Sequence, residues 1–453
     1  MFFSGLQQFG DDIALIEGDT VLCYADLQQR IDSFRKKLPQ NRQLVVLQAG
    51  NDITTLVTYL TCLQAGHVVI MVDKQIAEPY LQSLVDAYYP NWLVKDAEIS
   101  FVTDYHHVFD DDLALLLSTS GSTGSPKQVA LSKTNLQSNA DSICQYLPIL
   151  ASDKTITTLA PFYSYGLSVL NSHLLVGATI VLTEHSLVSR EFWTLFEQHQ
   201  INSFAGVPYS YEMLLRLRFT RKNLPDLRYF TQAGGKLATG KVAELAQYAQ
   251  QQDKRFFVMY GQTEATARMA FNADPLAKPE SIGRVIPGGE FCLQDEQGRL
   301  VSGEQQQGEL VYRGANIMLG YSRNKSDLCS FSSPDYLATG DLAYRDADGD
   351  YFISGRLARF IKPFSVRLNL DEVEALLADN QLTVAAVGND NKLQVGVQKS
   401  LEKPNDIRVI QQMLSQQLHL HPSVIQLAEF DMLPLTSSGK RDYATLQAWF
   451  DSK

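Results

Sequence analysis

Residues 119 to 127 read Thr119-Ser120-Gly121-Ser122-Thr123-Gly124-Ser125-Pro126-Lys127 and directly follow the apolar run Leu113–Leu117. Small, hydroxylated residues after a strand turn backbone N–H groups and hydroxyls toward one anion, and a lysine adds a cation to the same concavity. The stretch therefore predicts a phosphate-binding loop at the end of a strand. Its spacing differs from that of the ordinary P-loop, because no Gly-Lys-Ser/Thr follows Gly121 at the required distance. Taken alone, the stretch is equally compatible with a surface loop that binds nothing.

On both sides of this loop, from about residue 43 to 261, short apolar runs alternate with segments of helical periodicity. This alternation is typical of a parallel sheet wrapped by helices, so we expect an α/β fold. The expected strands are Leu44–Leu47, Val68–Val72, Leu113–Leu117, Thr155–Leu159, Thr179–Leu182, Ser203–Val207, Arg228–Thr231 and Phe256–Met259.

The pattern changes twice toward the C-terminus. After about residue 280, strand-like pieces alternate with polar turns such as Asp348-Gly349, which predicts a β-rich subdomain over about 280–357. From 358 a compact α+β tail is expected, with helices near Asp371–Leu377 and Ile407–Leu418. We therefore predict an N-terminal domain over 1–357 and a small C-terminal domain over 358–453.

Composition excludes several classes of protein. The 453 residues are 45% apolar and 20% charged, which is ordinary globular usage and argues against disorder. The net charge of −11 argues against a broad nucleic-acid or anionic-membrane surface. The five cysteines show no zinc spacing, and neither a signal peptide nor a membrane span is recognisable. We expect a cytoplasmic protein with no nucleic-acid partner and no membrane span.

Further motifs follow the loop along the chain in a fixed order. They are Ala233-Gly234-Gly235, Tyr260-Gly261-Gln262-Thr263-Glu264, Gly308-Glu309-Leu310, Gly320-Tyr321, Thr339-Gly340-Asp341, Gly355-Arg356 and Ser438-Gly439-Lys440. In this set and order the chain resembles the adenylate-forming superfamily of acyl-CoA ligases, peptide-synthetase adenylation domains and luciferases. The resemblance spans nearly the whole chain, and it implies that the C-terminal domain is mobile.

The resemblance implies binding of ATP and Mg²⁺. Tyr260 offers a ring face for adenine, Thr263 a hydroxyl for the α-phosphate, and Glu264 a hard oxygen ligand for magnesium. Asp341 and Arg356 would hold the ribose, although a surface salt bridge is the alternative interpretation of that pair. The residues implied in nucleotide binding are Thr119, Ser120, Gly121, Ser122, Thr123, Gly124, Lys127, Gly234, Gly235, Tyr260, Gly261, Gln262, Thr263, Asp341 and Arg356.

Lys440 is the catalytic residue that the resemblance implies. Attack of a carboxylate on the α-phosphate brings two anions together, and an ammonium near the forming bond offsets their repulsion most in the transition state. An acyl-adenylate and pyrophosphate would form first. A thiol, from coenzyme A or from the phosphopantetheine of a separate carrier protein, would then displace AMP.

Three positions depart from the family pattern. In relatives the tail rotates between the two steps about a hinge residue that is often charged, and the corresponding residue here is Ala358. Gln128 follows the loop lysine where glycine is usual, and Ser365 replaces a glycine that lines the thiol tunnel in relatives. Adenylation is therefore the better supported of the two steps.

The acid is expected to be a small-molecule carboxylate without an amine. Phe162, Tyr163, Tyr165, Gly166, Val207 and Ala233 are the expected wall of its pocket, although aromatic residues are equally ordinary at a strand-to-helix junction. No aspartate lies between Lys154 and Glu184 to pair with a substrate ammonium, so an aryl or fatty acid is favoured over an amino acid. Two alternatives stay open: a stand-alone amino-acid adenylation enzyme that loads a carrier protein, and a non-catalytic nucleotide-binding scaffold.

Overall fold

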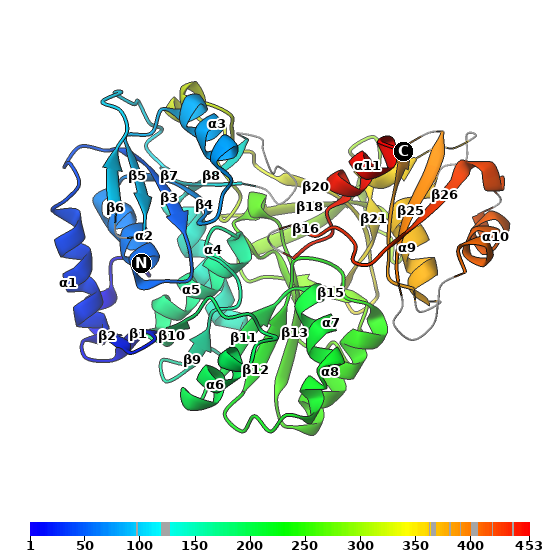
Figure 1. Cartoon of the computed structure of the whole chain (residues 1–453), viewed down its shortest axis with the longest axis horizontal. Helices are drawn as coiled ribbons and strands as arrows, with labels where there is room; N and C mark the ends of the chain where they lie inside the picture. The colour runs from blue at the N-terminus through cyan, green and yellow to red at the C-terminus, as the bar shows by residue number, and fades with distance from the viewer. Residues whose placement is uncertain are drawn as a thin grey trace. The chain divides into compact units, whose positions relative to one another are not determined.

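The computed structural model describes residues 1–96, 98–118, 127–361, 363, 368–379, 382–389, 391–399, 406–418, 420–436 and 439–453. The chain forms two compact units (Figure 1). The first comprises Met1–Phe291 and Tyr312–Leu337, and the second comprises Cys292–Val311 and Ala338–Lys453. The segment predicted to be β-rich, about 280–357, contributes strands to both units. The two compact units do not divide at the predicted domain boundary between 357 and 358, and that boundary stays a prediction.

The first unit contains a seven-stranded sheet in the order β19-β8-β7-β4-β3-β5-β6. Neighbours among β7, β4, β3 and β5 run parallel, whereas β19, β8 and β6 pair antiparallel. Its strands are β3 (Leu44–Ala49), β4 (Val68–Asp73), β5 (Trp92–Lys95), β6 (Glu98–Phe101), β7 (Leu113–Ser118), β8 (Gln128–Ser132) and β19 (Gly320–Ser322). Helix α1 (Tyr24–Arg35) precedes these strands in the chain, and α2 (Ile53–Ala65), α3 (Glu78–Tyr88) and α4 (Lys133–Tyr146) lie between them.

Both faces of this sheet are buried, as the continuous apolar runs predicted. All six residues of β3 are buried. Val45 and Leu47 pack with helices α1 and α2, whereas Leu44 and Val46 pack on the opposite face with α3. Helix α2 begins where Asp52 accepts a hydrogen bond from the Thr55 amide (2.7 Å) and ends at Gly66, which has φ +81°.

The second sheet of the first unit runs β2-β1-β10-β9-β11-β12-β13-β14-β15, with its six central strands parallel. Aromatic residues such as Phe204 and Phe230 pack on one face with α6, α7 and α8, and Ala205 and Tyr229 face the other side. Its elements are β1 (Ile13–Glu17), β2 (Thr20–Cys23), β9 (Lys154–Ile156), α5 (Ser164–Val176), β10 (Thr179–Leu182), α6 (Arg190–Gln198), β11 (Ser203–Gly206), α7 (Pro208–Arg216), β12 (Tyr229–Gln232), α8 (Thr239–Gln251), β13 (Arg255–Tyr260), β14 (Ala270–Asn272) and β15 (Ser281–Val285).

The second unit combines β-rich and α+β parts, with a core of its own around β24, β25, α9 and α10. The two predicted helices of the tail are present as α9 and α10, and an unpredicted last helix, α11, packs beside β24. The elements are β16 (Gly289–Gln294), β17 (Leu300–Val301), β18 (Gly308–Gly314), β20 (Leu337–Arg345), β21 (Tyr351–Arg356), β22 (Phe360–Ile361), β23 (Leu368–Asn369), α9 (Leu370–Asp379), β24 (Val384–Asn389), β25 (Lys392–Gln398), α10 (Ile407–Leu418), β26 (Ile425–Phe430) and α11 (Tyr443–Asp451), with β16, β18 and β20 crossing the boundary between units.

The structure thus confirms the α/β fold class. Each predicted strand between residues 43 and 261 corresponds to an observed one, with ends that differ by a few residues. Among the described residues, no helix has both the length and the apolar character needed to cross a membrane.

Candidate active site

The predicted phosphate loop joins two adjacent antiparallel strands. Ser118 at the end of β7 lies opposite Gln128 at the start of β8, and Leu117 lies opposite Val129. The loop residues Thr119, Ser120, Gly121, Ser122, Thr123 and Gly124 lie outside the described residues, as does Ser365. Lys127, the last residue of the motif, is half-buried at the base of this connection.

Lys127 lies in a charged cluster with two residues that are distant in sequence. Its Nζ is 3.5 Å from the centroid of the Tyr321 ring, and the Tyr321 hydroxyl donates a hydrogen bond to Glu264 Oε1 (2.9 Å). Tyr321 reaches this place because β19 pairs with β8, opposite Val129. Burial and the neighbouring Glu264 carboxylate raise the pKa of the Tyr321 phenol, so it stays protonated and serves as a donor.

The predicted metal ligand in this cluster suits a hard divalent cation. Within the described part of the chain, Tyr321 donates to Oε1 of Glu264, and no donor to Oε2 is present. Mg²⁺ binds one or two carboxylates together with substrate phosphates and water. One half-buried carboxylate with an uncommitted oxygen fits that donor set.

Glu264 is positioned by the segment that directly precedes β19 in the chain. Its carbonyl accepts the Met318 amide (2.8 Å), and Asn316 Nδ2 donates to the carbonyl of Ala265 (2.8 Å). Thr266 has φ +65°, a strained value for a β-branched residue, and its hydroxyl donates to the Asn316 carbonyl (2.7 Å). These contacts hold the backbone around Glu264 in one conformation.

The motif at the end of β13 depends on a close backbone crossing. A Cβ at Gly261 would lie 1.7 Å from the Ala267 carbonyl oxygen, so the chain at 267 passes directly over this glycine. Tyr260 is half-buried beside it, and Gln262 precedes the short 3₁₀ turn Thr263–Ala265. The Thr263 hydroxyl lies 3.2 Å from that of Ser164, the first residue of α5.

The predicted glycine turn lies at the carboxyl ends of two parallel strands. Ala233 follows β12, and its amide donates to the Gly206 carbonyl at the end of β11 (3.2 Å). Gly234 has φ +87°, and the Gly235 carbonyl accepts a hydrogen bond from Gln232 Nε2 (2.8 Å). The carboxyl ends of parallel strands are where α/β sheets bind ligands.

The structure brings the predicted pocket wall together. Tyr163, Tyr165, Val207 and Ala233 are buried in one apolar cluster, and Phe162 packs against it. The Tyr165 hydroxyl lies 2.8 Å from the Thr231 hydroxyl, and burial raises the pKa of this phenol. A Cβ at Gly166 would lie 2.4 Å from the Ala160 carbonyl oxygen, so this glycine permits the close approach of α5 to residue 160.

Two residues of this region were missed by the sequence analysis as site residues. Tyr321 was noted only within the family motif, because nothing local in the sequence places it beside Lys127. Arg268 lies on the chain between Glu264 and β14, and it is 1% exposed. A signal for it existed: Arg268 is a single charge among Ala265, Ala267 and Met269, directly after a chemical motif.

In the second unit, Asp341 and Arg356 form the predicted pair. They are directly opposite on β20 and β21, and Arg356 Nε lies 2.7 Å from Asp341 Oδ1. The Asp341 side chain is 2% exposed and that of Arg356 57% exposed. The burial of the carboxylate argues against a merely superficial salt bridge.

Lys440 lies in a tight turn of the second unit. The Thr436 amide donates to the Lys440 carbonyl (2.8 Å), and the Gly439 amide donates to the Thr436 carbonyl (2.9 Å). Gly439 has φ +75°, which suits glycine at this position of the turn. The turn therefore holds the backbone of the predicted catalytic lysine in place.

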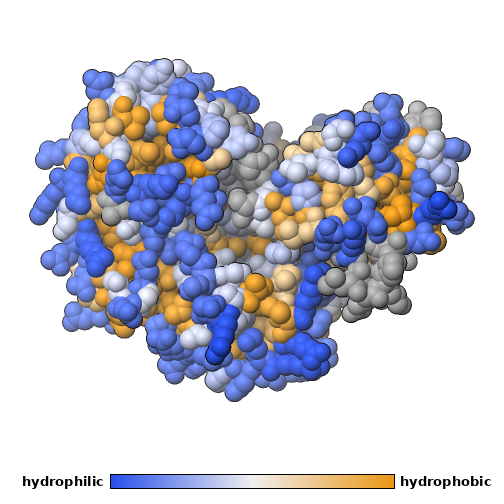
Figure 2. All heavy atoms as spheres, viewed as in Figure 1, coloured by the Kyte–Doolittle hydropathy of each residue, from blue (hydrophilic) through white to orange (hydrophobic). Residues whose placement is uncertain are grey.

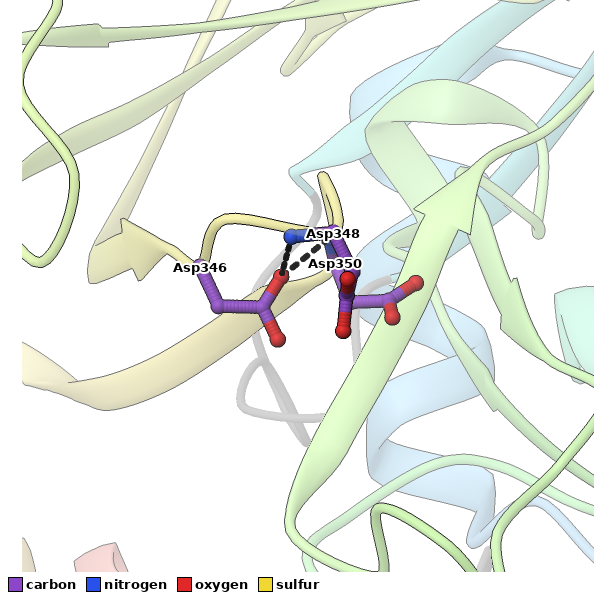
Figure 3. A group of neighbouring side chains, drawn as sticks. All are labelled: Asp346, Asp348 and Asp350. Atoms are coloured by element: carbon purple, nitrogen blue, oxygen red, sulfur yellow. Dashed lines mark hydrogen bonds between the residues drawn. The ribbon is translucent and has the colours of Figure 1, made fainter.

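Three carboxylates, Asp346, Asp348 and Asp350, gather in the turn between β20 and β21 (Figure 3). Asp346 Oδ1 accepts the amides of Asp348 (3.1 Å) and Asp350 (2.9 Å), which is an ordinary role of aspartate in a turn. Gly349 has φ +89°, as expected for the predicted hairpin dipeptide. Turn formation accounts for this cluster without a metal.

Comparison with known proteins gives the class: the family model described as "AMP-binding enzyme" matches residues 91–322, and the chain belongs to this family. It is 27% identical over 419 residues to the D-alanine–D-alanyl carrier protein ligase of Bacillus licheniformis, covering 83% of this chain and 82% of the relative. It is 33% identical over 289 residues to the L-proline–[L-prolyl-carrier protein] ligase of Pseudomonas fluorescens, covering 61% and 55%. The o-succinylbenzoate CoA synthetase of Bacillus subtilis has the same fold, with a TM-score of 0.80, 20% identity, and coverage of 98% and 97%.

Proposed function

We propose that this protein is an AMP-forming carboxylate–thiol ligase. It activates an aryl or fatty acid with ATP as an acyl-adenylate, and it then transfers the acyl group to the thiol of coenzyme A or of a separate carrier protein. The observation that carries the proposal is the cluster of Lys127, Tyr321 and Glu264 at the base of the phosphate loop. It combines a cation, a hydroxyl donor and a hard oxygen ligand where a nucleotide phosphate would be bound.

The expected nucleotide-binding residues have distinct roles in this proposal. Thr263 donates to the α-phosphate, Tyr260 stacks on adenine, and Lys127 with residues 119–124 holds the other phosphates. Asp341 accepts hydrogen bonds from both ribose hydroxyls, and Arg356 orients that carboxylate. Magnesium bound at Glu264 supplies charge neutralisation of the phosphates.

Lys440 would act at the reacting atoms. The substrate carboxylate attacks the α-phosphorus, a new P–O bond forms, and pyrophosphate leaves with the electron pair of the broken P–O bond. The Lys440 ammonium donates to the oxygens on which negative charge accumulates. In the second step a thiol attacks the acyl carbon and AMP leaves.

The proposal includes a mobile domain over 358–453, with its hinge at Ala358. The contacts of the next residue, Arg359, support this hinge. Its guanidinium carbon lies 3.8 Å from the centroid of the Tyr443 ring, and its Nη2 lies 2.6 Å from Glu374 Oε1. Both partners belong to the tail. Gly355 and Arg356, just before the hinge, instead pair with β20.

The thiol acceptor and the acid are supported by different observations. Similarity to two carrier-protein ligases supports a carrier protein as acceptor, with coenzyme A as the other possibility. The same two relatives act on amino acids, which keeps amino-acid adenylation as the second candidate function. The pocket wall favours an acid without an amine, since Phe162, Tyr163, Tyr165, Val207 and Ala233 carry no carboxylate to receive an ammonium.

A cytoplasmic location is part of the proposal and is supported by the free cysteines among the described residues.

The first test measures pyrophosphate release with ATP and Mg²⁺ against aromatic acids, fatty acids of several lengths, short dicarboxylates and the common amino acids. Turnover with one class of acid should fall at least about a hundredfold in Lys440→Ala, because one transition-state donor is lost. The matched control is Lys399→Ala, which removes an exposed lysine that pairs with exposed Asp431 (2.8 Å) and should change little. Release with amino acids alone would establish the second candidate. Silence across the panel, from protein shown to bind ATP, would favour a non-catalytic scaffold.

A further inference from the structure

The pocket wall contains a buried positive charge. Arg268 is 1% exposed, and its guanidinium lies 4.3 Å from the centroid of the Tyr165 ring. Its Nε donates to Ser168 Oγ (3.2 Å), and Nη1 donates to the thioether of Met259. Tyr165 and Met259 belong to the apolar cluster that contains Tyr163, Val207 and Ala233.

Among the residues that the structure describes, the contacts of this guanidinium are with neutral groups. A hydroxyl, a thioether and aromatic rings surround it, and the phenol of Tyr146 also lies beside it. Within the part of the chain that the structure describes, no Asp or Glu forms an ion pair with Arg268. Asp153, a buried carboxylate near His173, is paired with Arg228.

Such a charge is unusual, because buried charges in proteins are almost always paired with an opposite charge. An unpaired buried guanidinium raises the free energy of the folded protein, and an anion that enters beside it removes that cost. The planar guanidinium matches a carboxylate in particular, since two N–H groups can donate to its two oxygens.

Helix α5 contacts both Arg268 and Thr263, the residue proposed to bind the α-phosphate. The Ser164 hydroxyl lies 3.2 Å from the Thr263 hydroxyl, and the Ser168 hydroxyl lies 3.2 Å from Arg268 Nε. The two serines are one helical turn apart, which corresponds to about 6 Å along the axis. The positive charge is therefore within the reach of a short acid whose first carboxylate is at Thr263.

We propose that the acid activated by this protein is a short-chain dicarboxylate, whose second carboxylate pairs with Arg268. This inference rests on the ligase activity of the proposed function, and it replaces the aryl or fatty acid named there with a dicarboxylate at the same site. The charge of the wall also explains the missing aspartate: a substrate ammonium would be repelled by Arg268, whereas a second carboxylate needs no acidic partner.

The test compares succinate, butyrate and 4-aminobutyrate, which share a chain length and differ in the charge at the far end. In pyrophosphate release, succinate should exceed butyrate in kcat/KM by about a hundredfold, since leaving one partner of a buried charge pair alone typically costs that much or more. In Arg268→Met the preference should disappear, mainly through a higher KM for succinate. Malonate with propionate, and glutarate with valerate, extend the comparison to other lengths.

The matched control is Arg255→Met, which removes an exposed arginine that also stacks on an aromatic ring (Phe257, 4.7 Å). It should keep the wild-type preference. A thermal-shift measurement adds a readout that does not depend on turnover: a dicarboxylate should raise the Tm of the wild type and of Arg255→Met but not of Arg268→Met. Arg268→Lys, which keeps the charge but not the planar fork, serves if the methionine variant does not fold.

The outcomes separate this inference from the proposed function. Turnover with monocarboxylates or amino acids alone, or an unchanged preference in Arg268→Met, would overturn the dicarboxylate inference and leave the ligase proposal standing. Pyrophosphate release with no acid would overturn the ligase proposal. In that case a Tm shift by dicarboxylates that requires Arg268 would still support the anion site, and the lack of such a shift would reject it.

Discussion

At the scale of single residues, Gly261 shows how tightly the candidate site is built. The main chain at Ala267 and Arg268 crosses so closely that a side chain at 261 would collide with backbone atoms, which cannot rotate away. This crossing determines where Glu264 lies on one side and Arg268 on the other. A glycine here is required by space, because the position has no room for a methyl group.

We therefore expect Gly261→Ala to lower the free energy of unfolding by at least about 2 kcal/mol, through overpacking against backbone. Pyrophosphate release should fall with it, since the segment carrying Glu264 must shift. Gly240→Ala is the control, because nothing lies within 4 Å of a Cβ built there and the residue is in helix α8. That variant should gain up to about 1 kcal/mol. Urea unfolding measures both, and equal stability of the two variants would contradict the close crossing.

At the scale of elements, helix α5 links Thr263, a proposed nucleotide-binding residue, to the cluster proposed as the pocket wall. Ser164 contacts Thr263, Ser168 contacts Arg268, and His173 lies farther along the same buried helix. The His173 Nδ1–H donates to the Val169 carbonyl (2.7 Å). Burial lowers the pKa of His173 to about 4, with Arg268 contributing in the same direction.

This histidine makes the stability of the protein depend on pH. The unfolded chain takes up the His173 proton near the ordinary value of 6.5, and the folded protein only near pH 4. Between these values the unfolded state binds more protons, so the free energy of unfolding decreases as the pH falls from 6.5 toward 4. The contribution reaches on the order of 3 kcal/mol at the acid end and vanishes above pH 6.5.

The measurement is urea unfolding at pH 7.5 and pH 5 of the wild type, His173→Gln and His185→Gln. The His173 variant should lose less stability on acidification than the wild type. His185 is exposed, so its replacement should leave the pH dependence unchanged. The same acid sensitivity in all three proteins would show that His173 is not buried as a neutral imidazole.

At the scale of the whole molecule, the two compact units have separate hydrophobic cores. Leu214 on α7 belongs to a core of the first unit, and Leu393 on β25 belongs to a core of the second. Side chains of both polarities share the visible surface (Figure 2), as is usual for globular proteins.

Separate cores predict separate thermal transitions. Leu393→Ala should lower the free energy of unfolding of the second unit by about 2 to 5 kcal/mol, and so lower the temperature of its transition. Leu214→Ala should do the same to the first unit. Differential scanning calorimetry of the full chain with ATP absent resolves them. A single transition that both variants shift equally would show that the units unfold as one.

Much of the fold was accessible from the sequence because the relevant signals are local. Runs such as Leu113–Leu117 bury both faces of a strand, and helix ends carry their own caps, as at Asp52 and Gly66. Asp341 and Arg356 could also be predicted from the sequence as site residues, since each lies in a short motif. Tyr321 and Arg268 were not predicted as site residues, because their roles depend on contacts between strands and loops that are far apart in the chain.

The sequence by itself determined the α/β class, the order of the motifs and the residue types available for phosphate, metal and ribose. Tertiary structure alone decided which of these residues meet. Pairing of β19 with β8 brings Tyr321 to Lys127 and Glu264, and Arg268, at the crossing over Gly261, is buried beside Tyr165 and Met259. The physical reason is that strand order and side-chain burial depend on packing among distant segments, whereas hydrophobic periodicity and turn chemistry depend only on neighbouring residues.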